Sequence, residues 1–106
     1  DVLHVEDLVR AYEAAIRSPD EIRGQAFNIG GGTAQTLSLL ELIEMLESHF
    51  KRKIPLKFDA WRPGDQEVYV SDVRKLAQKL GWKPSVDAKQ GVGRLIEWVE
   101  QNRDAF

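Results

Sequence analysis

The chain has 106 residues, of which 42% are hydrophobic and 30% charged, and its formal net charge is -2 at pH 7. These values are typical of one small globular domain and exclude a disordered chain, while the slight negative charge offers no basic footprint for nucleic acid. The absence of cysteine excludes disulfides and thiolate metal sites and agrees with a cytoplasmic location, and no run approaches the roughly eighteen apolar residues of a membrane span.

The N-terminal part predicts an extended start followed by a helix. Residue 1 is aspartate and residues 1–3 read as the interior of a strand, so we expect a piece of a longer protein; simple omission of an initiator and a few residues is the alternative. The next residues predict an amphipathic helix over 5–17 that ends near Ser18 and Pro19. Its apolar positions recur at helical spacing: Val5, Leu8, Val9, Tyr12, Ala15 and Ile16.

A strand and a second helix are expected next. Residues 26–29 (AFNI) are short, apolar and followed by three glycines, a pattern typical of a buried parallel strand. Ser38 and Glu41 have the spacing of a capping box and predict the start of a helix, which the basic run 51–53 is expected to close. The predicted apolar face of this helix is Leu39, Leu42, Ile43, Leu46 and Phe50.

Two more short strands, at residues 54–58 and 68–70, precede two more helices. Asp72 is expected to cap the third helix and Gly81 to end it, with Trp82 folding back onto it. Asp87 and Gln90 predict the start of the last helix, whose expected buried stripe is Val92, Leu95, Ile96 and Val99. The predicted fold class is α/β, an α+β-like single small domain of about four helices with short strands between them.

The segment 62–66 (RPGDQ) carries the best candidate for ligand binding. Pro63 fixes its own φ and Gly64 permits a positive φ, so this turn is stiff and holds Arg62 with little ordering cost. A guanidinium binds phosphate oxygens in pairs, which favours a phosphorylated ligand. The alternative, favoured by these residues alone, is a surface salt bridge from Arg62 with Asp65 capping the turn. Trp61 is the aromatic residue most suited to stack on a nucleobase, whereas Trp82 is expected in the core.

Other patterns do not complete an active site. The three glycines 30–32 lack the spacing of a dinucleotide or phosphate-binding loop, and the capped helix starts too far downstream, so they are interpreted as a permissive turn. His4 and His49 have no partners at metal-ligand spacing, and no serine has the arrangement of a nucleophile. Glu41, Glu44 and Glu47 are three residues apart and are interpreted as a solvated helix face.

Six segments taken together resemble the C-terminal third of NAD-dependent nucleotide-sugar epimerases and dehydratases, which are extended short-chain dehydrogenases/reductases. They are residues 1–8 (DVLHVEDL), 27–32 (FNIGGG), 38–41 (SLLE), 62–66 (RPGDQ), 70–72 (VSD) and 80–84 (LGWKP). They occur in the family's order and cover essentially the whole chain. Within the family the similarity is greatest to the CDP-paratose (CDP-tyvelose) 2-epimerase group.

The resemblance implies a role for two residues of the turn. In such enzymes the arginine of this loop contacts the pyrophosphate of the sugar nucleotide and the loop's acid approaches the ribose, which nominates Arg62 and Asp65 as substrate-binding residues. Asp72 is interpreted as a helix cap rather than a ligand. The implied partner is a nucleotide-diphosphate sugar, with a CDP-sugar favoured.

The resemblance also implies that catalysis and NAD binding belong to the part of the parent enzyme outside residues 1–106. The family's Gly-x-x-Gly-x-x-Gly turn and Tyr-x-x-x-Lys pair lie upstream in such enzymes, and neither Tyr12 nor Tyr69 has lysine at the fourth following position. We therefore expect a C-terminal nucleotide-sugar-binding domain with no catalytic residue and no cofactor-binding or metal-binding residue of its own. NAD would be bound by an upstream Rossmann domain, and epimerisation would be the activity of the parent alone.

Two hypotheses follow from this interpretation. In the first, the chain is the substrate-binding part of such an enzyme, and the strand at residues 26–29, which resembles the family's late strand at the edge of the dinucleotide-binding sheet, is left with an exposed edge. This edge predicts self-association into a homo-oligomer. In the second, the chain is a free-standing, non-enzymatic interaction module with the same small fold.

Overall fold

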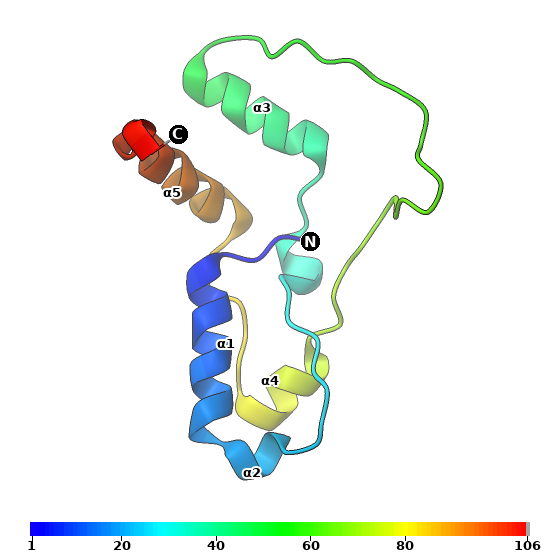
Figure 1. The fold of residues 1–106 in the computed structure, drawn as a ribbon, viewed down its shortest axis with the longest axis vertical. Coiled ribbons are helices and arrows are strands. Elements are labelled where there is room, and N and C mark those ends of the chain that lie inside the picture. The colour runs from blue at the N-terminus through cyan, green and yellow to red at the C-terminus, as the bar shows by residue number, and fades with distance from the viewer. Residues whose placement is uncertain (106) are drawn as a thin grey trace. The chain divides into compact units, whose positions relative to one another are not determined.

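The computed structural model describes residues 1–105, which contain five α-helices and two short 3-10 helices. The α-helices are α1 (Val5–Arg17), α2 (Pro19–Ile22), α3 (Leu39–Phe50), α4 (Arg74–Leu80) and α5 (Ala88–Gln101), and the 3-10 helices are η1 (Gly32–Gln35) and η2 (Arg103–Ala105) (Figure 1). No helix in this range combines the length and the apolar character needed to cross a membrane.

The chain divides into two compact units, each of which is described by itself. Unit 1 consists of Asp1–Thr36 together with residues 70–105, and unit 2 is Leu37–Tyr69. Unit 2 contains α3 and a long segment after it that has no regular secondary structure up to residue 69 (Figure 1). The chain therefore leaves unit 1 once, after Thr36, and returns to it once, at Val70.

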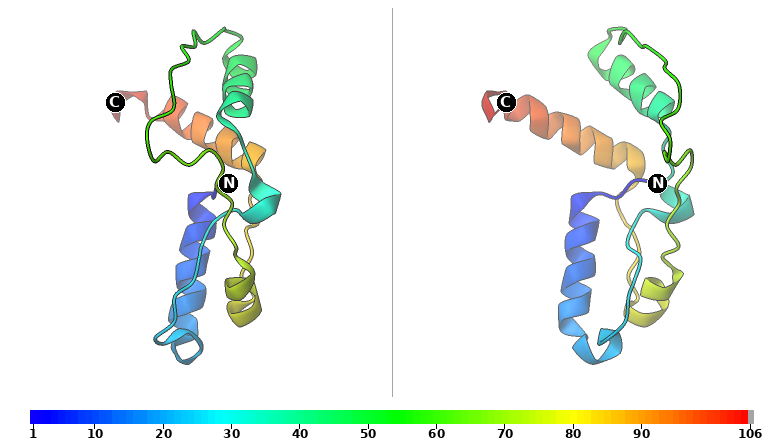
Figure 2. Two further views of the ribbon diagram at one scale, coloured as in Figure 1. Left: turned by 90° about the vertical axis from the view of Figure 1, so that its right-hand side faces the viewer. Right: turned by 45° about the vertical axis from the view of Figure 1, so that its right-hand side comes forward.

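The core of unit 1 is small and lies where α1, α4 and the segment after α4 meet. Ala11, Leu76 and Trp82 are its buried members, each no more than 4% exposed. Because α2 also contacts both α1 and α4, the three helices form one corner of the unit, which the two views of Figure 2 confirm. The prediction that Trp82 folds back onto the helix before it is confirmed. Partly buried residues around the core are Leu3, Phe27, Ile29, Val73 and Leu80.

A buried carboxylate holds α1 to the segment that precedes α5. Asp7 has 0% exposure, and its oxygens accept hydrogen bonds from Arg10, from the backbone N–H groups of Ser85 and Val86 at 3.0 Å each, and from the Ser85 hydroxyl at 2.9 Å. The indole N–H of Trp82 donates to the backbone carbonyl of Asp7 at 3.0 Å. One turn of α1 thus anchors residues that are more than 70 positions away in the sequence.

The predicted helix ends are largely confirmed. The Ser38 hydroxyl accepts from the Glu41 N–H and the Glu41 carboxylate accepts from the Ser38 N–H, so the capping box is complete. Gly81 has a φ of 64° at the C-cap of α4, and Asp87 caps α5 by accepting from the Gln90 N–H. These helix ends could be predicted from the local sequence because each capping interaction joins residues three or four positions apart.

The predicted strands are absent from the part of the chain that the structure describes. Residues 1–3, 26–29, 54–58 and 68–70 all have irregular backbone. A strand is defined by ladder hydrogen bonds to a neighbouring strand, and residues 1–105 provide these segments with no such neighbour. The short strands of the predicted α/β fold are therefore not seen in residues 1–105, whose regular secondary structure is helical, whereas the four main helices match the prediction.

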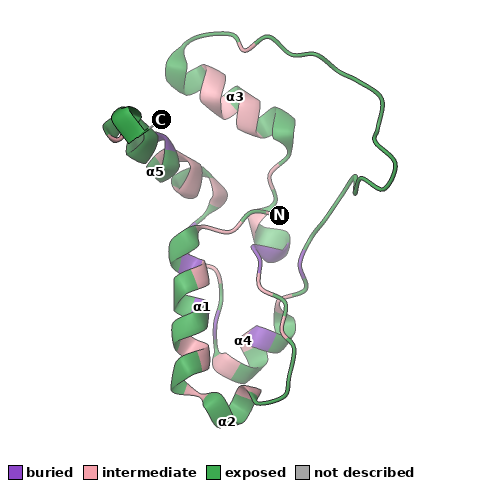
Figure 3. Ribbon diagram, in the orientation of Figure 1, coloured by how far each residue is buried: buried purple, intermediate pink, exposed green. Residues whose placement is uncertain are grey.

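The apolar helix faces predicted from the residue spacing are mostly not buried. The buried residues of α1 are Asp7 and Ala11, whereas Val5, Val9, Tyr12 and Ile16 are 50–78% exposed. In α5 only Ile96 of the predicted stripe is buried, and α3 has no buried residue (Figure 3). Helical spacing identified the apolar residues correctly, but it could not tell whether a partner surface within the chain covers them.

Candidate functional site

The candidate site is the turn formed by residues 62–65 in unit 2. The Asp65 N–H donates to the Arg62 carbonyl at 3.1 Å, which closes the turn, and Gly64 has a φ of 85°. Proline at the second position and a positive φ at the third are the features of a type II turn. The predicted stiffness of this turn therefore has a structural basis in Pro63 and Gly64.

Arg62 and Asp65 form an ion pair within the turn. The Arg62 Nε–H donates to Asp65 Oδ2 at 3.0 Å, and the arginine side chain is 84% exposed, against 34% for the aspartate. The salt bridge expected as the alternative to ligand binding is thus present. It uses one of the five N–H groups of the guanidinium, which keeps its planar fork at the surface. The pair also fixes the direction of the Arg62 side chain.

The aromatic residues near the turn differ in exposure. Trp61 is 69% and Tyr69 56% exposed, whereas Trp82 belongs to the core of unit 1. The prediction that Trp82 is a core residue is confirmed. Trp61, directly before Arg62, has the exposed ring area that stacking on a base requires.

The three glycines do not form a cradle for a dinucleotide such as NAD. All three are buried, and a Cβ atom on Gly30 or Gly31 would collide with the Ser71 side chain or the Val2 carbonyl. The space beside these glycines is filled by the protein itself, and Gly32 alone has a positive φ, 64°. Close packing, rather than a permissive turn alone, is therefore the reason for glycine at 30 and 31.

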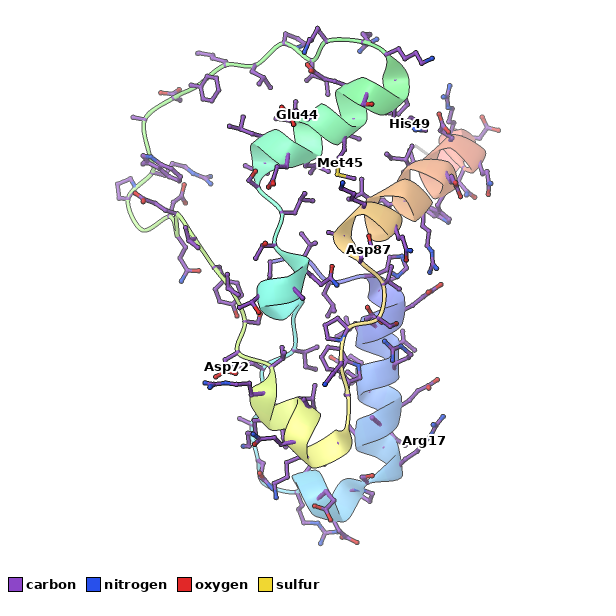
Figure 4. The ribbon with its side chains drawn as sticks, turned by 180° about the vertical axis from the view of Figure 1, so that it is seen from behind. Arg17, Glu44, Met45, His49, Asp72 and Asp87 are labelled. Carbon is purple, nitrogen blue, oxygen red and sulfur yellow. The ribbon has the colours of Figure 1, made fainter. Side chains whose placement is uncertain are left out.

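Asp72 lies just before α4 and accepts from its first N–H group, but it is not the N-cap residue that was predicted (Figure 4). Its carboxylate accepts from the Arg74 N–H at 3.1 Å and forms a two-point ion pair with the Arg74 guanidinium at 2.9 and 2.6 Å. These hydrogen bonds from Arg74 lower the pKa of Asp72 to about 2. The N-cap residue of α4 is Val73, one residue later.

The two histidines and Glu47 of α3 have structural partners. His4 Nδ1 accepts from the Glu6 N–H and caps α1, and the ring of His49 packs edge-on against Phe50. Glu47 accepts from Lys53 at 2.6 Å and from the Ile54 N–H at 2.8 Å, which lowers its pKa. Among residues 1–105 there is no group of three or more histidine or acidic residues able to hold a metal ion.

A surface depression of about 370 Å³ lies at the C-terminal end of α3. Its lining mixes both signs of charge, and neither Arg62 nor Asp65 contributes to it. Because it is lined by acidic and basic side chains in nearly equal number, it has no clear preference for an anionic ligand. Its lining residues are Glu44, Glu47, Ser48, Lys51, Arg52 and Lys53.

The sequence reasoning missed the role of Asp1. Its Oδ2 accepts from the Gly32 N–H at 2.7 Å and from the Ser71 N–H at 3.0 Å, and Oδ1 accepts from the Ser71 hydroxyl at 3.3 Å. We call this arrangement the Asp1 clamp. These partners are 31 and 70 residues away, so no local pattern could have indicated them.

Comparison with known proteins identifies relatives of the chain. The family model described as GDP-mannose 4,6 dehydratase matches residues 1–95. CDP-paratose 2-epimerase of Salmonella typhi is 41% identical over 99 residues, which cover 93% of this chain and 29% of that protein. UDP-glucose 4-epimerase of Homo sapiens is 31% identical over 107 residues, covering 100% of this chain and 30% of that protein.

A solved structure agrees with these matches. The crystal structure of UDP-glucose 4-epimerase from Bifidobacterium longum in complex with NAD+ and UDP is similar with a TM-score of 0.79 and 29% identity. The similarity covers 100% of this chain and 31% of the solved chain. The chain thus spans less than a third of the length of the relatives that it matches.

Proposed function

The chain belongs to the family described as GDP-mannose 4,6 dehydratase, with nucleotide-sugar epimerases among its relatives, and from this premise we propose that residues 1–106 are the nucleotide-sugar-binding domain of an NAD-dependent epimerase. The proposed activity of the parent is that of a CDP-paratose 2-epimerase. The identity of 41% to that enzyme, against 31% to the human UDP-glucose 4-epimerase, supports a CDP-sugar as substrate.

The observation that carries the proposed binding function is the exposed guanidinium on a rigid turn. Arg62 would bind the diphosphate of the nucleotide sugar through the N–H groups that its pair with Asp65 does not use. Asp65 has two parts in this proposal: one carboxylate oxygen orients Arg62, and the carboxylate accepts a hydrogen bond from a ribose hydroxyl. Trp61 offers an exposed ring beside the same turn.

The test is titration of CDP and UDP against the full-length parent and its Arg62→Ala variant. Loss of a charged, two-point contact should weaken binding by about 1.5 to 3 kcal/mol. Arg23→Ala is a matched control, because Arg23 is 81% exposed and pairs with an aspartate three residues away, as Arg62 does. Unchanged affinity in Arg62→Ala would remove this residue from the site.

We propose that the redox chemistry belongs to a Rossmann domain upstream of Asp1. The close packing of Gly30 and Gly31 supports this division, because a single Cβ atom at either position would already collide with Ser71 or Val2. The isolated 106-residue chain should therefore neither epimerise a CDP-hexose nor bind NAD tightly. Calorimetry with NAD and a turnover assay with the isolated chain check both expectations, and turnover by the chain alone would refute the proposed division.

We also propose a cytoplasmic location and a homo-oligomeric state. A cytoplasmic location is supported by the absence of cysteine, which suits a reducing compartment. Homo-oligomer formation is supported by the exposed apolar residues of α1. The intact mass of the native protein, measured in cell extract, separates a long enzyme from a natural module that begins near Asp1.

A further inference from the structure

The Asp1 clamp binds two residues of unit 1 that are close in sequence to the two chain connections with unit 2. The first connection leaves unit 1 after Thr36, four residues beyond Gly32, and the second returns at Val70, next to Ser71. One carboxylate oxygen of Asp1 accepts from the N–H groups of both Gly32 and Ser71. A single side chain thus ties together the two places where unit 2 is attached.

Several neighbouring contacts make this junction tight. The Val2 N–H donates to the Gln35 carbonyl at 2.9 Å, so the residue next to Asp1 also holds η1. Ser71 is 6% exposed and lies against Gly30, where no Cβ atom could fit. The N–H groups that Asp1 accepts from therefore have little access to water, and their hydrogen bonds depend on this carboxylate.

We propose that Asp1 is a positioning residue for nucleotide-sugar binding, because its carboxylate fixes the two attachment points of the unit that carries Arg62. This inference rests on the proposed function of Arg62. With the clamp intact, the ends of unit 2 are ordered before the ligand arrives. Without it, binding has to order both connections, and that entropy cost appears as weaker affinity.

The clamp acts through hydrogen-bond acceptance rather than through charge alone, and this distinction makes it testable. An asparagine at position 1 keeps one oxygen, which can accept from both N–H groups, while its amide can donate to the Ser71 hydroxyl. An alanine at position 1 has no side-chain atom that can accept a hydrogen bond. Asp1→Ala should therefore impair the junction, and Asp1→Asn should largely preserve it.

The experiment compares the full-length parent with its Asp1→Ala and Asp1→Asn variants by CDP and UDP titration and by steady-state kinetics with a CDP-sugar. We expect Asp1→Ala to raise the Kd and the KM about tenfold with kcat nearly unchanged, and Asp1→Asn to stay within about twofold of the wild type. Asp20→Ala, an exposed aspartate paired only at the surface of α2, is the control. Amide hydrogen exchange at residues 32 and 71 should accelerate in Asp1→Ala.

The possible outcomes separate this inference from the proposed function. If the wild-type parent binds neither nucleotide, the proposed function fails and the inference fails with it. If the wild type binds and Asp1→Ala binds equally well, the inference alone is wrong. A fall in kcat at unchanged KM in Asp1→Ala, not restored by Asp1→Asn, would show that Asp1 merely supports folding and would also overturn the positioning role.

Discussion

At the scale of single residues, unit 1 depends most on the carboxylate of Asp7. Burial alone raises the pKa of this carboxyl, but hydrogen bonds from Arg10, the Val86 N–H and both donors of Ser85 outweigh it and lower the pKa to about 2. A buried charge that is well hydrogen-bonded contributes little net stability, whereas its removal leaves the buried backbone N–H groups that faced it without an acceptor. Removing Asp7 should therefore lower the free energy of unfolding by more than the hydrogen-bonded carboxylate adds to it.

The Asp7→Ala substitution should lower the free energy of unfolding of the chain by about 3 kcal/mol, because it leaves the Ser85 and Val86 N–H groups without their acceptor inside the fold. Urea denaturation at neutral pH measures the effect. Asp20→Ala removes an exposed carboxylate and should change the free energy by no more than about 0.5 kcal/mol. Equal effects of the two substitutions would contradict the buried network.

Acid should destabilise the fold in a defined window. Because the pKa of Asp7 is about 2 when folded and near 3.8 when it is free, the unfolded chain binds the proton first, and stability is lost as the pH falls from about 4 towards 2. Urea midpoints measured from pH 6 to pH 2 should decline less in Asp7→Asn than in the wild type. Asp72→Asn, at an exposed ion pair, should leave the wild-type decline almost intact.

At the scale of elements, alanine substitutions at two glycines with equally open surroundings should change the stability in opposite directions. A Cβ atom on Gly93, inside α5, or on Gly81, at the end of α4, would meet nothing within 4 Å, but Gly81 has a φ of 64°. Gly93→Ala should stabilise the chain by about 0.5 to 1 kcal/mol, because alanine favours the helix. Gly81→Ala should destabilise it by about 1 kcal/mol through the left-handed backbone. Thermal unfolding of both variants checks the signs.

At the scale of the whole molecule, many large apolar side chains of residues 1–105 are exposed and few are buried. Val5, Val9, Tyr12 and Ile16 form a stripe along α1, and residues 26–29 have no strand neighbour among residues 1–105. We predict dimers or larger species for the isolated chain. Light scattering over a concentration series measures this, and a clean monomer at high concentration would contradict it.

A paired variant locates the association surface. Replacing Val9 and Tyr12 by glutamate should shift the chain towards monomer, because charges on the α1 stripe would have to be desolvated in any interface. Val68→Glu changes an 81% exposed residue outside α1 and should leave the association state unchanged. If the double variant associates like the wild type, the α1 stripe is not the association surface, and the irregular segment 26–29 becomes the next candidate.

The amino-acid sequence by itself determined the four main helices, their caps at Ser38, Gly81 and Asp87, and the turn that carries Arg62, because these features arise between residues only a few positions apart. It also determined the family, since a series of motifs in a fixed order is a property of sequence. The substrate-binding roles of Arg62 and Asp65 stay predictions that the nucleotide titrations test.

The tertiary structure alone decided which of these elements have partners. Strands were predicted from composition, but a strand exists only where another strand pairs with it, and residues 1–105 supply none. The Asp1 and Asp7 carboxylates bind donors 70 or more residues away, a distance over which no spacing rule operates. Glycines 30 and 31 look like a flexible turn in the sequence and are close-packed in the fold, because what surrounds them comes from Val2 and Ser71.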